Sequence, residues 1–423
     1  MNSPDIEKIY KRNFWALLVE ATCFVGAAAT MSTTGVVALF INAMTGSTVI
    51  VGLAITVQSL FMIAGQLTGA PFTRSIRRLP ETLTKIMLAE RFIPFFMALP
   101  LFLAVDGHWA VGIFLVFFGM FWFFEGSMAV PWAELCARAI KPDLRGYTIG
   151  MQVTAGGISS LLVGLLITWL LATPLLDVNY RFGVIFMTGG VLFLASLLGM
   201  RLIRDPNPIG VPEKPHIRKF YSQIPKVIRN SKHLQRVLLA RLPAFIGFAS
   251  LPFMLVFGSA TLDLSDAQVS WLVYANIIGG LLCGISMGAV SRRFGNKPVI
   301  IMCNTGVLIS LCMAILLTVY PVLGYTWLFL TCLLSSLSLS CWFGYFTYLI
   351  DIAPKVERPY FMVVDACIGI PFSFIGYAMG ALINSYGYVP AFLLSAVFAI
   401  AAIILSTFLL SKHKIIAMRE QSV

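Results

Sequence analysis

Long apolar runs alternate with short polar segments along the whole chain. An α-helix needs about 20 mostly apolar residues to cross a bilayer core of roughly 30 Å, and each run is long enough. The first half contains runs at 14–41, 48–72, 83–104, 109–135, 147–172 and 181–203, and the second half at 237–260, 268–290, 298–319, 326–352, 360–384 and 389–411. This pattern predicts an all-α membrane protein with twelve transmembrane helices.

Composition supports this class and excludes a soluble protein. The 423 residues are 59% hydrophobic and 11% charged, whereas a soluble globular protein is about 25% charged. The eight cysteines are scattered without a Cys-x-x-Cys pair, which favours small buried side chains over a metal site. We expect neither a metal nor a cofactor.

The placement of positive charge predicts orientation. The net charge is +12, and nearly all Lys and Arg residues lie in alternate loops or at the adjoining helix ends. Basic residues concentrate in cytoplasmic loops, so we expect both termini on the cytoplasmic side of the cell (inner) membrane. This placement accounts for the charge and argues against a nucleic-acid partner.

The polar stretch 204–236 is the only long hydrophilic segment, and it holds five prolines and many basic residues. It predicts a cytoplasmic linker between an N-terminal six-helix bundle, 1–203, and a C-terminal one, 237–423. The part at 216–235 has the pattern of a helix lying on the membrane surface.

Two short basic turns occupy matching places in the halves. The second reads Gly288-Ala-Val-Ser-Arg292-Arg293-Phe-Gly295-Asn296-Lys297-Pro298, and a weaker copy begins at Gly69, 219 residues earlier (288 − 69). Glycine at the start lets helices approach closely, and Gly295 permits a tight turn. Two copies between apolar runs indicate a duplicated six-helix unit.

These turns resemble the loop between the second and third helices of each half in major facilitator superfamily transporters. The family pattern is Gly, three residues, an acid, Arg, one residue, Gly, then basic residues; here Arg292 and Thr73 stand where the acid is expected. The resemblance implies two pseudo-symmetric bundles, with helices 1, 4, 7 and 10 around a cavity that opens to one side at a time. A bacterial source is expected.

Acidic residues within the apolar runs are candidates for proton coupling, because a charge in hydrocarbon is costly and rare without function. Glu125 is the strongest candidate, since it lies near the middle of its run with no base nearby in sequence. Asp365 and Glu20 are further candidates, although both could also pair at the interface. Glu90-Arg91 is expected to be a local pair, because helix 3 is peripheral in the resembling fold.

Polar and aromatic residues within the runs are candidates for a substrate cavity. Arg241 can bind an anionic group or extend to the membrane surface. The other candidates are Trp122, Gln152, Asn276, Trp342, Tyr345 and Tyr348. Helix packing and interhelical hydrogen bonds are the alternative interpretation of this set.

A cytoplasmic gate is expected where Glu134 and Asp351 end their helices beside basic residues. In the resembling family such acids meet the basic loop motif, which predicts Arg74, Arg77, Arg292 and Arg293 as partners. The full set of gate candidates is Gly69, Arg74, Arg77, Arg78, Glu134, Arg145, Gly288, Arg292, Arg293, Gly295, Lys297, Asp351 and Arg358.

Taken with the resemblance, these features predict a monomeric secondary transporter that moves a small solute and protons across the bilayer. A lipid flippase or drug exporter on the same fold, and a non-transporting receptor or scaffold, are the alternatives. The chain has no Gly-x-x-x-x-Gly-Lys-Ser/Thr loop, which argues against an ATP-driven pump, and no nucleophile or metal motif that would predict an enzyme. The sequence leaves open the substrate, the direction, the coupling ion and the stoichiometry.

Overall fold

The computed structural model describes residues 3–33, 35–46, 48–172, 176–206, 216–262, 264, 266–339 and 342–420. Within these residues every regular element is helical, which confirms the predicted all-α class. Ten segments of the described chain are long and apolar enough to cross a membrane. They coincide with ten of the twelve predicted spans, and the other two, 14–41 and 83–104, are interrupted helices.

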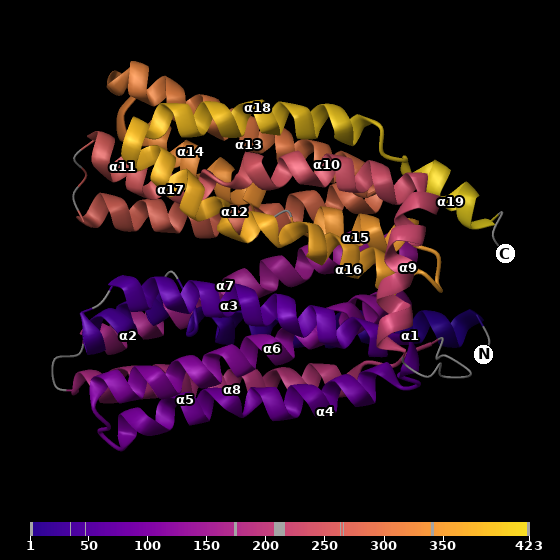
Figure 1. The fold of residues 1–423 in the computed structure, drawn as a ribbon, viewed down its shortest axis with the longest axis horizontal. Coiled ribbons are helices and arrows are strands. Elements are labelled where there is room, and N and C mark those ends of the chain that lie inside the picture. Colours follow the sequence, from indigo (N-terminus) through magenta and orange to yellow (C-terminus); the bar gives the residue numbers. More distant parts are fainter. Residues whose placement is uncertain are drawn as a thin grey trace. The chain divides into compact units, whose positions relative to one another are not determined.

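The described residues of the first half form eight helices and two short 3-10 helices (Figure 1). In order these are α1 (Ser3–Ala29), α2 (Val36–Thr45), α3 (Thr48–Gly69), η1 (Ala70–Ser75), α4 (Leu79–Arg91), α5 (Ile93–Phe102), α6 (Gly107–Ala139), η2 (Pro142–Leu144), α7 (Arg145–Ala172) and α8 (Val178–Leu202). The amphipathic helix α9 (Ile217–Asn230) follows, within the segment predicted for a surface helix.

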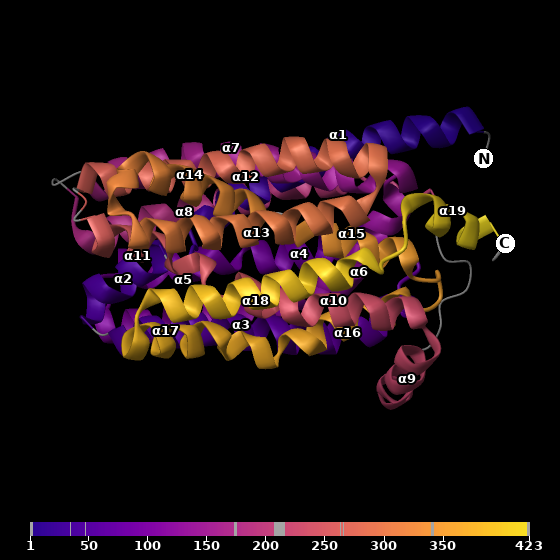
Figure 2. The ribbon, with the colours of Figure 1, turned by 90° about the horizontal axis from the view of Figure 1, so that it is seen from above.

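In the described residues of the second half, three of the predicted spans are single helices and three are pairs of helices. The elements are α10 (Lys232–Phe248), η3 (Leu251–Phe253), α11 (Met254–Leu262), α12 (Asp266–Phe294), α13 (Asn296–Val319), η4 (Pro321–Leu323), α14 (Gly324–Leu339), α15 (Phe343–Ile352), α16 (Arg358–Gly369), η6 (Pro371–Phe374), α17 (Ile375–Tyr386), α18 (Tyr388–Thr407) and α19 (Lys412–Glu420). The long members of this set, α12, α13 and α18, run along one common direction (Figure 2).

The chain groups into two compact units. Unit 1 contains 1–141 and 155–220, and unit 2 contains 142–154 and 221–423. In unit 1, α3 packs on α6, and α8 packs on α1 and α5; in unit 2, α12 packs on α14, and α18 on α10 and α13. The first ten residues of α7 group with unit 2, so the simple predicted division at residue 203 stays a prediction.

Several predicted single helices are interrupted, and the sequence at each break gives the reason. The run 14–41 divides into α1 and α2 at a turn rich in Ser, Thr and Gly, where the Thr30 hydroxyl donates to the Ala27 carbonyl at 2.7 Å. Such hydroxyl bonds compete with helical ones. The run 83–104 divides between α4 and α5 two residues before Pro94, whose ring has no N–H to donate.

Two predicted spans of the second half break at proline as well. Pro252 lies in the turn between α10 and α11, and Pro371 begins the turn between α16 and α17. The run 326–352 is represented by α14 and α15, and residues 340 and 341 between them lie outside the described part. A break in a helix leaves backbone N–H and C=O groups without their helical hydrogen-bond partners. Such breaks are therefore tolerated at membrane depth only where protein or a water-filled cavity surrounds them.

Each unit has its own apolar core. In unit 1 the core is notably aromatic: the rings of Phe40, Phe114 and Phe186 lie with centroids 4.9 to 5.4 Å apart. Phe121 and Phe193 continue this cluster, with centroids 5.0 Å apart. In unit 2 the core is formed largely by aliphatic side chains around Leu272, Val307, Leu311 and Leu328.

Glycines bring α3 and α6 into direct backbone contact. A Cβ atom placed on Gly65 would lie 2.1 Å from the Phe123 carbonyl oxygen, and one on Gly69 would lie 2.0 Å from the Ser127 carbonyl oxygen. From the other side, a Cβ on Gly126 would lie 2.1 Å from the Met62 carbonyl oxygen. No side chain fits at these positions, so glycine sets the distance between the two helices.

Replacing Gly69 with alanine should therefore destabilise the protein, because the new methyl group can only be placed by moving backbone. We expect a cost of about 1–3 kcal/mol, as for other overpacked sites, seen as a lower midpoint of thermal unfolding in detergent. Gly112→Ala is the matched control, because a Cβ there meets nothing within 4 Å. Equal midpoints for the two variants would contradict the packing argument.

Candidate functional site

A charged cluster lies buried in unit 1, at the end of α4. Glu90 and Arg91 are both completely inaccessible to solvent, and Arg91 Nη1 donates to Glu90 Oε1 at 2.8 Å. The same nitrogen lies 3.7 Å from Glu125 Oε2, whose side chain is 24% exposed. One guanidinium thus serves two carboxylates from two different helices.

A third carboxylate, Glu20 of α1, belongs to the same cluster. It is 5% exposed and interacts electrostatically with Arg91 and Glu125. Gly199 of α8 allows this helix to approach, because a Cβ there would lie 2.5 Å from the Glu20 backbone nitrogen. We call Glu20, Glu90, Arg91 and Glu125 the unit 1 charge cluster.

Aromatic rings surround the guanidinium of this cluster. Its central carbon lies 4.7 Å from the ring centroid of Phe24 and 5.1 Å from that of Phe193. Arg91 Nε and Nη2 are buried without a hydrogen-bond partner in the described part of the chain. Trp122 packs against Phe118 and Phe121 of the aromatic core, and Phe193 belongs both to that core and to the surroundings of Arg91.

The cluster changes two sequence-based interpretations. Glu125 has no base nearby in sequence, but Arg91 of another helix lies 3.7 Å from it. Glu90 and Arg91 form the local pair that was expected, yet both residues are buried rather than peripheral. The signal was present in the sequence: Leu79, Leu83, Met87, Glu90 and Arg91 are the buried positions of α4, and they follow helical spacing. The two charged residues therefore continue an apolar stripe, which marks them as buried.

A second ion pair lies within unit 2. Arg241 Nε of α10 is 3.4 Å from Asp365 Oδ1 of α16, and each side chain is about one-fifth exposed, at 20% and 21%. The guanidinium lies between two rings, 4.6 Å from the centroid of Phe245 and 4.6 Å from that of Tyr345. The structure thus brings together three sequence candidates, Arg241, Asp365 and Tyr345.

The remaining cavity candidates of unit 2 have different surroundings. The Tyr345 hydroxyl is buried and accepts from Asn304 Nδ2 at 3.2 Å. Tyr348 is buried too, and its hydroxyl accepts from the backbone nitrogen of Leu410, three residues after the end of α18, at 2.7 Å. Trp342 is 48% exposed. Asn276 is half-buried on α12, and Gln152 is buried on α7.

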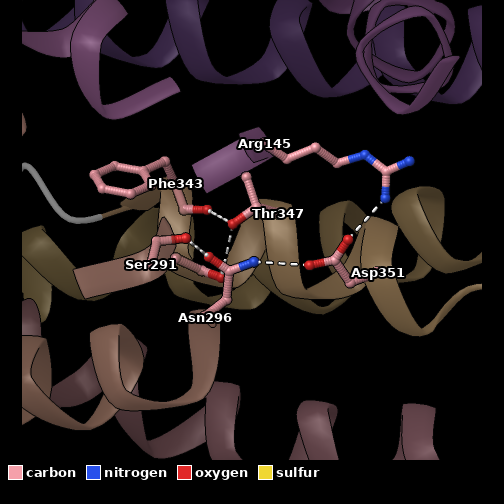
Figure 3. A network of polar contacts seen from close by, with 7 residues as sticks. Arg145, Ser291, Asn296, Phe343, Thr347 and Asp351 are labelled. Atoms are coloured by element: carbon pink, nitrogen blue, oxygen red, sulfur yellow. Dashed lines mark hydrogen bonds and ion pairs between the residues drawn. The ribbon is translucent and has the colours of Figure 1, made fainter. Parts of the chain in front are cut away.

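A polar network joins the start of α7 to α12, α13 and α15 within unit 2 (Figure 3). Arg145 Nη1 donates to Asp351 Oδ1 at 2.7 Å, and Asn296 Nδ2 donates to Asp351 Oδ2 at 2.8 Å. The Ser291 hydroxyl donates to Asn296 Oδ1 at 2.6 Å. The sequence predicted a role for Arg145 and Asp351, but it did not identify Asn296 as the residue that joins the turn motif to the acid.

Glycines and small residues let α7 lie against α12 beside this network. A Cβ on Gly150 would lie 2.5 Å from the Gly284 carbonyl oxygen and 2.8 Å from Gly288 Cα. Gly295 is the single residue between α12 and α13. It has φ +85°, a conformation that glycine adopts without strain.

The other gate candidates are dispersed. Glu134 accepts from Arg138 at 2.7 Å, and Arg138 also reaches Asp205 at 3.2 Å. Arg78 pairs with Glu81 on the surface, and Arg292 lies over the Tyr147 ring at 5.3 Å. The rest are placed as follows: Arg74 half-buried, Arg77 exposed, Arg293 over Phe294, Lys297 donating to the Thr407 carbonyl, and Arg358 buried.

Comparison with known proteins agrees with this architecture. The family model of the Major Facilitator Superfamily matches residues 237–419. The proton:xylose symporter XylE, bound to 6-bromo-6-deoxy-D-glucose, superposes with a TM-score of 0.72 at 13% identity, over 96% of this chain and 97% of that one. The chain has the major facilitator superfamily fold.

Other solved structures are similar to this chain over nearly their whole length. A bacterial homologue of the iron transporter ferroportin, in an outward-facing state, gives a TM-score of 0.74 at 12% identity, covering 93% of this chain and 98% of that one. The E. coli fucose:proton symporter FucP gives 0.72 at 12% identity, with 95% and 99% covered. No curated protein matches the sequence. The fold that the resemblance of the two loop motifs implies is confirmed, and the chain is a multi-pass membrane protein.

Proposed function

We propose that this protein is a secondary transporter that moves a small organic solute across the cell membrane by alternating access, driven by protons. The unit 1 charge cluster is the observation that carries the proposal. Two of the similar structures are proton-linked sugar symporters by their descriptions. Their substrates are not transferred to this chain, because identities of 12 and 13% support the fold alone.

The charge balance of the cluster supports proton coupling. Three carboxylates surround one guanidinium, so full ionisation would leave an excess negative charge in a buried place. Excess buried charge is costly, and a bound proton removes it. Glu125 is the member best placed to exchange a proton, because it is the most exposed while its partner Arg91 is fully buried.

The unit 2 ion pair supports a role in substrate binding. Arg241 and Asp365 are charged side chains of unit 2 that lie within predicted spans and are partly exposed, with buried Tyr345 beside them. A polar solute that carries an acidic or hydroxyl group can compete for the guanidinium, whose flat fork suits oxygen ligands. The Asp365 carboxylate then loses its cationic partner, and it can bind a proton or accept a hydrogen bond from the substrate.

The proposal is tested by identifying a ligand and measuring its flux. A thermal-shift screen of metabolites on the purified protein selects binders, since binding raises the unfolding midpoint by mass action. Proteoliposomes with an imposed pH gradient should then accumulate a selected solute above its equilibrium concentration. Uptake that stops at equilibrium with or without the gradient would leave an uncoupled facilitator, and no flux of any binder would favour a receptor.

The network around Asp351 should act as a gate whose opening exposes α7. Asp351→Asn removes the charge that balances buried Arg145, and loss of one partner of a buried pair is strongly unfavourable, about 3–5 kcal/mol. We expect a cysteine placed at buried Gln152 to react at least ten times faster with a hydrophilic maleimide in this variant. Glu81→Gln, which breaks the exposed pair with Arg78, is the control; equal rates in both variants would argue against the gate.

A further inference from the structure

The helix α9 has a basic edge. Residues 216–236 contain six Lys and Arg, and no Asp or Glu occurs from His216 to Leu262. Arg218, Lys226 and Arg229 are exposed, and their positions at i, i+8 and i+11 place them on one edge of the helix. The positive charges on this edge therefore have no acidic partner within their own segment, 216–262.

The opposite edge of α9 is apolar and only partly covered by protein. Phe220 and Val227 are buried, at 6% and 8% exposure, whereas Ile217 on the same side is 53% exposed. Ile224 and Ile228 are half-buried. A helix with a basic edge and a partly uncovered apolar edge fits an interface between water and lipid acyl chains.

The orientation of α9 matches such an interface. Most of the helix belongs to unit 2, and it runs across the direction of α10 and α18 at the end where α10 begins (Figures 1 and 2). Since α18, and α10 together with η3, are among the segments able to cross a membrane, a helix transverse to them lies along the membrane plane. Its position is fixed by hydrogen bonds from Tyr360 Oη to Gln223 Oε1 at 2.5 Å and from Gln235 Nε2 to the Ile228 carbonyl at 2.8 Å.

We propose that α9 is a docking surface for anionic phospholipid headgroups. The basic edge, Arg218, Lys226 and Arg229, faces the phosphates, and Ile217 enters the acyl boundary beside them. A basic residue near an anionic leaflet contributes a several-fold gain in affinity, and three on one edge act together. Because Tyr360 belongs to α16, which also carries Asp365, the docked lipid holds the helix that bears one partner of the unit 2 ion pair.

Lipid binding by the purified full-length protein tests this surface without any transport assay. Short-chain phosphatidylglycerol should raise the unfolding midpoint of the wild type in a concentration-dependent way, and short-chain phosphatidylcholine should not. The triple variant R218Q/K226Q/R229Q should need at least ten times more phosphatidylglycerol for the same rise. The control K11Q/K85Q/K355Q removes three exposed charges elsewhere and should respond as the wild type does.

An equal loss of the phosphatidylglycerol response in both triple variants would overturn the proposal, because general surface charge would then explain the rise in unfolding midpoint. A wild-type midpoint that does not rise, or that rises equally with phosphatidylcholine, would also overturn it. A second measurement does not depend on these variants. A nitroxide at position 217 in vesicles containing phosphatidylglycerol should collide with oxygen more often than one at exposed Asn230. Equal, water-like accessibility at the two positions would place α9 off the membrane.

Discussion

The Glu125→Gln variant should lose gradient-driven accumulation of substrate completely while it retains exchange of substrate across the membrane. Glutamine preserves the shape of the side chain and can still hydrogen-bond to Arg91, which lies 3.7 Å away in the wild type. It cannot release a proton, so the step that links the gradient to substrate movement is removed. Exchange needs no net proton transfer and should continue.

The measurement compares two modes in the same proteoliposomes: accumulation under an imposed pH gradient, and counterflow with substrate on both sides. Glu81→Gln is a suitable control, because this carboxylate is exposed and pairs only locally with Arg78. Full accumulation by Glu125→Gln would remove Glu125 from the coupling mechanism. Loss of both modes would indicate that the side chain is needed for the fold or for substrate binding.

Removing Arg91 should have the largest effect on stability. Arg91→Met keeps much of the volume but leaves Glu90, which is fully buried, without its hydrogen-bonded cation. Removal of one partner from a buried pair costs about 3–5 kcal/mol, since the remaining charge is uncompensated. We expect a markedly lower unfolding midpoint and poor yield in detergent.

A second substitution separates charge from packing in this variant. Adding Glu90→Gln to Arg91→Met removes the uncompensated carboxylate, so the double variant should recover part of the lost stability. Arg91 also packs on Phe24 and Phe193, and this contribution stays lost in both variants. Additive effects of the two substitutions, with no recovery, would contradict the view that Arg91 balances the cluster.

Much of the fold was accessible from the sequence, because apolar length and loop charge are strong signals in membrane proteins. Ten predicted spans coincide with apolar helical segments, and the paired turns at Gly69 and Gly288 indicated the superfamily fold. The breaks near Thr30, Pro94 and Pro371 were not predicted. Hydropathy does not register a break, since the residues beside a proline or hydroxyl-rich turn remain apolar.

The candidate site was accessible only in part. The free-energy cost of a charge in hydrocarbon was enough to identify Glu125 and Glu20 as candidates. Their contact with Arg91 could not be predicted, because it depends on how α4 packs against α6 and no local sequence pattern indicates that packing. Asn296 is a comparable case: its amide completes the ion pair of Arg145 and Asp351 through a tertiary contact. Arg241 and Asp365 were chosen separately from the sequence, and the packing of α10 near α16 is what pairs them.

The most direct test of proton coupling is to follow protons themselves. Proteoliposomes that enclose a pH-sensitive dye, with no imposed gradient, receive a pulse of a transported solute on the outside. The account predicts a change in internal pH with the wild type that is absent with Glu125→Gln, although both catalyse exchange. Substrate entry into wild-type vesicles with no change in internal pH would contradict it.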